Sequence, residues 1–167
     1  QHRTLSLLQT VKKLSEQIKH VKVKDQELQK ANAFLSSMWN NAGAIIIATD
    51  TSGTIELFNP AAEKYLGYTS VEVVGKQTPL LFHDSTEVQL YAAQFSEELG
   101  TVIEPGFETF VARARRNLPN QYEWTYITKK GKRLPVDVAI TALRNEQKEI
   151  TGFLGIAFDM TPQKQAE

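Results

Sequence analysis

The sequence contains no cysteine in its 167 residues, which excludes disulfides, thiolate catalysis and cysteine-ligated metals. It has no excess of either charge, because 19 basic residues balance 19 acidic ones, and nothing directs it toward nucleic acid or anionic lipid. Long apolar runs are also missing: the longest, residues 42–48, is too short to span a bilayer, and no signal peptide is visible. With 41% hydrophobic residues, we expect a cytoplasmic protein with one buried core and an appendage.

The two ends of the chain indicate a segment of a longer protein. The first residue is glutamine rather than methionine, and the last ten residues read FDMTPQKQAE. A strand-like apolar run ends at Phe158, after which Asp159 and Thr161 can accept hydrogen bonds from the free N–H groups of a helix's first turn. Pro162 suits the first helical position. We therefore expect residues 162–167 to begin an output helix.

The N-terminal region carries a heptad repeat with no glycine or proline before Gly43. Valine and isoleucine lead the a positions and leucine dominates the d positions, a combination that favours parallel dimers. Asp25 at an a position weakens the pattern locally. The pattern predicts a parallel homodimeric coiled coil over residues 1–40, although an amphipathic helix lying on its own domain is the alternative. The expected dimer seam consists of Val11, Leu14, Ile18, Val21, Leu28, Asn32 and Leu35.

The remaining residues alternate between strand and helix patterns. β-rich runs at 44–49 and 54–58 flank Asp-Thr-Ser-Gly, which is a hairpin signal, and Asn59-Pro60 then starts a helix that ends at Gly67. Further helices are expected over 84–100, where Asp84 and Glu87 resemble a capping box, and over 108–116. Three strands follow at 121–128, 133–143 and 150–159. This order predicts an α+β fold: one five-stranded antiparallel sheet with helices on one face, preceded by a long helix.

Several motifs in this order resemble a PAS domain with its C-terminal PAC half: Asp-Thr-Ser-Gly at 50–53, FNPAAEKYLGY, SVEVVGK, the Lys130-Gly131 hairpin and the closing Asp-Met-Thr. The resemblance covers 41–161. It implies a sensory and interaction module with a five-stranded sheet, of bacterial style, in which the terminal Asp-x-Thr marks the exit into a signalling helix. Asp159 and Thr161 are therefore the expected signal exit.

The resemblance also allows cofactors to be tested against residues. LOV-type photosensors need a reactive cysteine, which is absent here, so a covalent flavin adduct is excluded. Haem-binding relatives place a histidine on the helix before the third strand, and ETFVARARR has none. His83 is interpreted as a surface or loop-anchoring histidine rather than an axial haem ligand. Non-covalent flavin stays open, since Tyr122, Trp124 and Tyr126 could stack on a ring, although core packing is the simpler interpretation.

A small organic ligand in the cleft between sheet and helices is also open, for example a carboxylate or fatty-acid-like molecule. Core packing is again the alternative for the candidate pocket residues. Arg113, Arg115 and Arg116 could meet an acidic ligand, although a solvated helix end that complements the macrodipole is simpler. The candidate pocket residues are Ile47, Leu57, Leu66, Phe110, Val111, Val138 and Ile140.

The last strand is apolar on both faces, with Phe153 and Ala157 on one side and Leu154, Ile156 and Phe158 on the other. Because a sheet with one wet face should alternate polar residues there, we expect the outer face to be covered, either by the helix around 34–39 or by a second protomer.

These observations favour a sensory and dimerisation module, not an enzyme, since no catalytic constellation or metal-ligand set is present. It would relay a small-molecule or conformational signal to a covalently linked C-terminal effector, either a histidine kinase or a diguanylate cyclase. The alternative is a ligand-free dimerisation and relay module.

Overall fold

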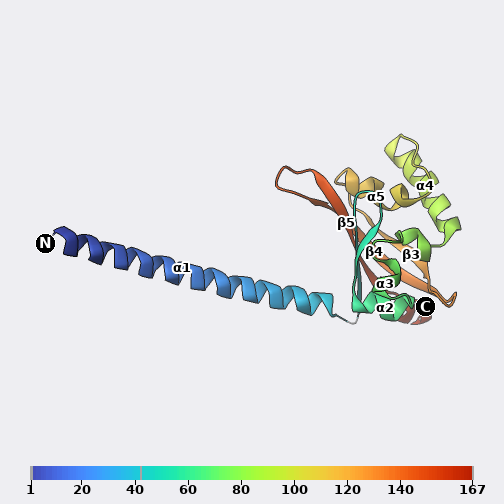
Figure 1. The fold of residues 1–167 in the computed structure, drawn as a ribbon. Helices are drawn as coiled ribbons and strands as arrows, with labels where there is room; N and C mark the ends of the chain where they lie inside the picture. The colour runs from blue at the N-terminus through green and yellow to red at the C-terminus, as the bar shows by residue number, and fades with distance from the viewer. Residues whose placement is uncertain (1, 42, 167) are drawn as a thin grey trace. The chain divides into compact units, whose positions relative to one another are not determined.

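The computed structural model describes residues 2–41 and 43–166, with side chains from Thr4 onward. The chain divides into two compact units, Gln1–Met38 and Trp39–Glu167. The first unit lies within a single long helix, and the second holds a sheet with its helices (Figure 1).

Helix α1 (His2–Trp39) runs for 38 residues. It contains neither glycine nor proline, so nothing interrupts its backbone hydrogen bonding. Its apolar heptad side chains each expose more than half of their surface in the single chain, and a helix of this length with such a stripe is typical of a coiled-coil partner. These exposed side chains are Leu7, Val11, Leu14, Ile18, Val21, Leu28 and Leu35.

The second unit is built on one five-stranded sheet in the order β2-β1-β5-β4-β3, and every neighbouring pair is antiparallel. The predicted fold class is therefore confirmed. The strands are β1 (Ala44–Thr49), β2 (Ile55–Phe58), β3 (Gln121–Ile127), β4 (Arg133–Arg144) and β5 (Ile150–Asp159).

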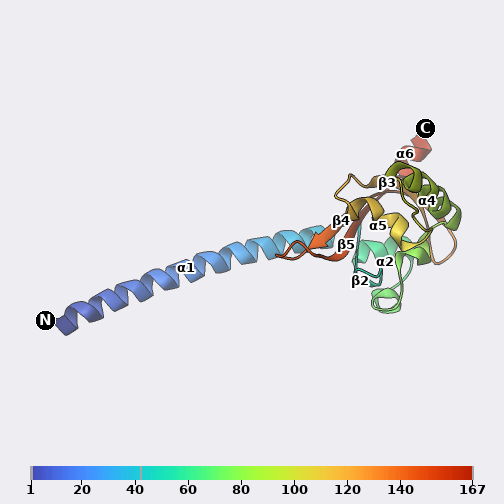
Figure 2. The same ribbon diagram turned by 90° about the horizontal axis from the view of Figure 1, so that it is seen from above.

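Helices α2 (Pro60–Leu66), α3 (Ser70–Val73) and α5 (Phe107–Arg115) contact the sheet and cover one of its faces (Figures 1 and 2). Two predicted caps are confirmed: the Asn59 side chain accepts from the amide of Ala62, and Asp84 accepts from the amides of Thr86 and Glu87. The other helices are the 3-10 helix η1 (Pro79–Phe82), α4 (Ser85–Leu99) and α6 (Thr161–Ala166).

The predicted hairpin turn between β1 and β2 is closed by Asp50. Its Oδ1 accepts hydrogen bonds from the amides of Ser52 and Thr54, each at 2.9 Å. Gly53 follows with φ of 99°, and a Cβ at this position would lie 2.7 Å from the Phe107 ring. Glycine is therefore required here both by the backbone conformation and by the approach of α5.

The two faces of the sheet differ in burial. Phe153 and Ala157 are buried under the helices, whereas Leu154 and Ile156 on the outer face are half-buried. Phe158, also on the outer face, is 50% exposed, and Leu57 on β2 is 49% exposed. The exposed apolar side chains of the outer face in the single chain therefore lie on β2 and β5.

Candidate functional site

A small cavity of about 40 Å³ lies between the inner face of the sheet, η1 and α5. Its wall is apolar and rich in aromatic rings, and among the described residues no carboxylate, ammonium or guanidinium group lines it. The lining residues are Ile47, Thr49, Pro79, Phe82, His83, Phe107, Phe110, Val111, Tyr126, Val138, Ile140, Phe153 and Gly155.

His83 is the most polar member of this wall. Its Nδ1 lies 2.6 Å from the carbonyl oxygen of Pro79. Because a carbonyl only accepts, Nδ1 carries the proton, and the neutral ring leaves Nε2 as a bare acceptor. The imidazole packs against the rings of Phe110 and Tyr126, with centroids 4.1 and 4.9 Å away. The interpretation of His83 as a loop anchor fits this contact with η1. His83 is partly buried, and its imidazole lines the cavity.

Tyr126 supplies the second polar atom. It is 4% exposed, and burial raises the pKa of its hydroxyl, so the group stays protonated. Within the described residues, the Tyr126 hydroxyl has no hydrogen-bond partner. Every side-chain nitrogen or oxygen there that is sealed from solvent does have a partner. The Tyr126 hydroxyl therefore borders accessible space. Together with His83 it makes the cavity a largely apolar space with two uncharged hydrogen-bonding groups.

The burial of the His83 ring should make the free energy of unfolding depend on pH. Burial lowers the pKa of His83 from 6.5 to about 4, with the Pro79 carbonyl opposing the shift. The unfolded chain therefore binds a proton that the folded chain does not between these values, and stability is lost as the pH falls from 6.5 to 4. We expect His83 to account for a loss of about 3 kcal/mol over this range.

Urea unfolding of the full chain at fixed protein concentration between pH 7 and pH 4 measures this loss. In the His83→Phe variant, the free energy of unfolding should change less steeply with pH between 6.5 and 4 than in the wild type. This holds whatever the variant's absolute stability. Asp50 and Asp84 have lowered pKa values, so they affect the free energy of unfolding at lower pH. Their contribution is the same in the wild type and the variant. An unchanged slope in the variant would contradict the assignment.

The structure places five of the predicted pocket residues in the cavity wall: Ile47, Phe110, Val111, Val138 and Ile140.

Leu57 and Leu66 are corrections to that prediction. Leu57 faces outward because an irregularity in the β1–β2 ladder pairs Thr49 with Ile55 and Ala48 with Leu57, so both Ile55 and Phe58 point inward. Leu66 is fully buried beneath the end of α2, away from the cavity.

Sequence reasoning considered Tyr126 for stacking on a flavin and His83 as an axial haem ligand, but it did not place them in the cavity wall. It missed Phe82, Phe107 and Phe153, whose only signal was the number of aromatic residues.

The volume of the cavity limits which cofactors can fit. A volume of about 40 Å³ has room for a few water-sized groups, whereas pockets for drug-sized ligands typically measure about 300–1,000 Å³. An isoalloxazine ring or a haem therefore does not fit in this conformation, although Nε2 of His83 is chemically able to bind iron. Tyr122 and Trp124 pack against α4 and α5 rather than lining an open cleft.

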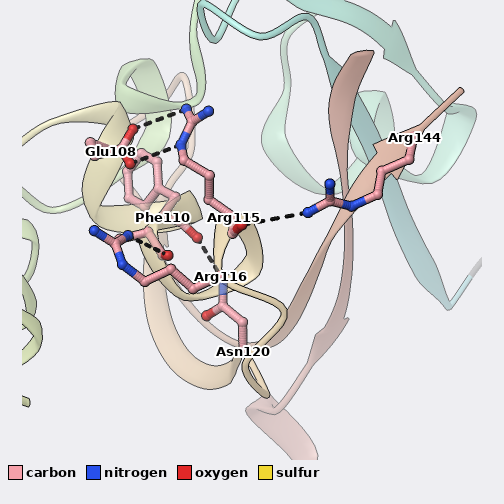
Figure 3. A network of polar contacts seen from close by, with 7 residues as sticks. Glu108, Phe110, Arg115, Arg116, Asn120 and Arg144 are labelled. Atoms are coloured by element: carbon pink, nitrogen blue, oxygen red, sulfur yellow. Dashed lines mark hydrogen bonds and ion pairs between the residues drawn. The ribbon is translucent and has the colours of Figure 1, made fainter. Parts of the chain in front are cut away.

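Arg113 and Arg115 of α5, and Arg116 directly after it, are committed to internal contacts. Figure 3 shows those of Arg115 and Arg116. Arg115 forms a double hydrogen bond with Glu108, at 3.0 and 3.1 Å, and Arg116 donates to the carbonyl of Ala112 at 2.8 Å. Arg113 donates to the carbonyl of Pro119 and pairs with Glu98. None of them lines the cavity. The cavity therefore holds no cationic partner for a carboxylate ligand.

The start of α6 is organised by Asp159. Its Oδ1 accepts from the amide of Thr161 at 2.8 Å and from the Thr161 hydroxyl at 2.6 Å. The helix begins at Thr161, so this threonine donates to the capping carboxylate instead of acting as the cap itself. The amide of Met160 donates to the carbonyl of Pro135, which holds the exit against β4. Both predicted exit residues therefore meet at one strand-to-helix junction.

No helix within the described residues is long and apolar enough to cross a membrane. Likewise, the described part of the chain holds no group of three or more His, Cys, Asp or Glu side chains arranged for a metal ion.

Comparison with known families gives one match over most of the chain. The sequence pattern of the family described as PAS domain matches residues 42–162. No curated protein matches.

Solved structures agree on the fold. The PAS domain of an HTR-like protein from Haloarcula marismortui is 23% identical, with a TM-score of 0.54 over 83% of this chain and 98% of that one. A domain of a sensory box sensor histidine kinase/response regulator from Geobacter sulfurreducens is 24% identical, with a TM-score of 0.54 over 78% and 94%. The LOV protein of Rhodobacter sphaeroides is 15% identical, with a TM-score of 0.56 over 83% and 72%.

Proposed function

The chain belongs to the PAS domain family, and we propose that it is a sensory and dimerisation module of a cytoplasmic signalling protein. In this proposal it relays a signal from α1 and the cavity to an effector that follows α6. The effector is a histidine kinase or a diguanylate cyclase. The likeness to a domain of a sensor histidine kinase from Geobacter sulfurreducens supports the first choice.

The observation that carries the sensory part is the cavity beside His83 and Tyr126. The bare Nε2 of His83 accepts a hydrogen bond, the Tyr126 hydroxyl donates or accepts one, and the rest of the wall is apolar. A carboxylate would lose its hydration there without meeting a cation. The wall therefore suits a small uncharged molecule, and an acidic ligand is disfavoured.

Native mass spectrometry with an absorbance scan of the purified full chain tests this part. A bound small molecule adds mass, and that mass should be lost in the Tyr126→Phe variant, which keeps the ring but removes the hydroxyl. A colourless wild-type protein with no added mass favours the ligand-free relay.

The small volume of the cavity favours the second candidate, the ligand-free dimerisation and relay module. About 40 Å³ accommodates water but not a typical metabolite unless η1 or α5 moves. In that case the signal enters as strain through α1, and the cavity only allows the helices to shift. Both candidates use the same dimer and the same exit.

The proposed homodimer uses the seam of α1 and the apolar outer face of the sheet. On this face Leu57 and Phe158 are about half exposed, and Leu154 and Ile156 lie beside them. Exposed apolar groups of this kind gain free energy when a second protomer covers them. The coiled coil is parallel in this proposal, so the second units of both protomers follow the same end of it.

The exit should affect signalling more than folding. Asp159→Ala removes both contacts to Thr161 and should reduce local helix stability by about 0.5–2 kcal/mol, whereas Thr161→Ser keeps the hydroxyl and serves as the matched control. In a fusion to a kinase or cyclase, Asp159→Ala should change basal activity or the response, and Thr161→Ser should not. If both variants behave as wild type, the junction is a cap without a regulatory role.

A further inference from the structure

A second hollow, of about 480 Å³, lies beside the exit and is separate from the aromatic cavity. It is formed by the end of α2, the β3–β4 hairpin and the start of α6. The amide of Lys129 donates to the carbonyl of Leu66 at 2.9 Å, and this bond holds the hairpin beside α2. The hollow is lined by Lys64, Tyr65, Leu66, Gly67, Thr128, Lys129, Lys130, Lys132, Leu134, Asp159 and Thr161. We call it the lysine groove.

The charges of the lysine groove are unbalanced although the whole chain is neutral. Four lysines line it against one carboxylate, that of Asp159, which already accepts two hydrogen bonds from Thr161. Lys129 is paired with Glu72 at 2.8 Å. The other three have neither an ion pair nor a side-chain hydrogen bond within the described residues: Lys64, Lys130 and Lys132.

Ammonium groups of one sign around a concave surface raise the local concentration of anions. Lysine recognises phosphate as a compact point charge with three rotatable donors, which suits a mobile multivalent anion. The volume lies in the range typical of small-molecule sites. Tyr65 is partly exposed and gives the groove an apolar surface on which a ring or hydrocarbon body can pack.

We infer that the lysine groove binds a small phosphorylated molecule, a nucleotide being the best-fitting class, next to the junction of β5 and α6. Phosphate groups contact Lys130 and Lys132 on the hairpin and Lys64 on α2, and the remainder of the ligand packs against Tyr65. Since Asp159 and Thr161 form one wall, the bound anion changes the electrostatic surroundings of the Asp159–Thr161 contact. The site thereby adds a second input to the proposed relay, independent of the aromatic cavity.

Isothermal titration calorimetry of the full chain with ATP, pyrophosphate and adenosine tests the site. ATP should bind, adenosine should not, and pyrophosphate should bind more weakly than ATP, because it lacks the body that packs on Tyr65. Binding should weaken as salt is raised. The double variant Lys130→Gln, Lys132→Gln should weaken ATP binding about tenfold or more, since it removes two charge-assisted contacts.

The matched control is Lys76→Gln, Lys148→Gln, which removes the same charge from exposed positions outside the groove and should leave ATP binding unchanged. Amide NMR signals of Lys64–Gly67, Thr128–Lys132 and Asp159–Thr161 should shift with ATP, and Tyr126→Phe should not alter the titration. The inference is overturned if ATP does not bind at millimolar concentration, or if the control loses as much affinity as the groove variant. It is also overturned if phosphatidylglycerol vesicles bind through Lys130 and Lys132 while ATP does not, since the groove then faces a membrane.

Discussion

Replacing Asn59 with alanine is expected to lower the free energy of unfolding of the full chain by about 3–6 kcal/mol. The side chain is fully buried and uses all four of its hydrogen-bonding positions. Its Oδ1 accepts from the amides of Ile46 and Ala62, at 3.0 and 2.9 Å. Its Nδ2 donates to the carbonyls of Ala44 and Trp39, at 2.8 and 2.9 Å. Alanine leaves these groups unpaired in the interior.

Urea unfolding at fixed protein concentration measures the loss. Asn145→Ala is the matched control, because Asn145 also accepts from a backbone amide, that of Glu149, but lies in the exposed β4–β5 turn. Water replaces its lost contact, and we expect a loss below about 1 kcal/mol. Equal losses in the two variants would show that Asn59 is only a helix cap. A large loss at Asn59 alone identifies it as the residue that joins β1, α2 and the start of the second unit.

Deleting residues 1–33 should raise the dissociation constant of the proposed homodimer by about a hundredfold or more, which is a loss of about 3 kcal/mol. The removed seam contains most of the apolar a and d residues of α1, each worth roughly 1.5–3 kcal/mol if fully buried. Chain ordering and association oppose that gain, so only part of it appears in the affinity. Sedimentation equilibrium across the micromolar range measures the change.

Two valines on α1 provide a point-mutant form of this test. Val21 lies at a d position and Val23 at an outward f position, and both expose more than half of their surface in the single chain. Val21→Asp should weaken the dimer strongly, because it places a carboxylate in the seam, whereas Val23→Asp should leave it intact. Replacing Asp25, itself at an a position, with valine should tighten the dimer. A full chain that stays monomeric at tens of micromolar contradicts the coiled coil.

The outer apolar face and the seam make separable contributions to assembly. Phe158→Ser reduces the apolar surface of the sheet without touching α1. If the two surfaces lie in one dimer, combining this substitution with Val21→Asp gives a non-additive loss, as expected for coupled contacts.

The local sequence was sufficient to determine most elements of the fold. Asn59, Gly67, Asp84 and Gly100 mark helix ends through hydrogen bonds and left-handed backbone conformations that depend on neighbouring residues only. The three C-terminal strands end within a residue of their predicted limits, because turn residues separate long apolar runs. The order of these elements, together with family motifs, was enough to identify the PAS domain.

Only the tertiary structure decided what converges in space. Leu57 turns outward because the register of the β1–β2 pair breaks at Thr49, and register is a property of two strands. His83 lies inside a ring of aromatic side chains because η1 packs against β3 and α5, which are distant in sequence.

The lysine groove exists because one backbone bond brings residues 64–67 against 128–132, and neither segment alone indicates a site. Local hydrogen bonding and periodicity act over a few residues and can therefore be predicted from sequence. Cavities and charge clusters depend on long-range packing, so their volume and their occupants follow from the folded chain alone.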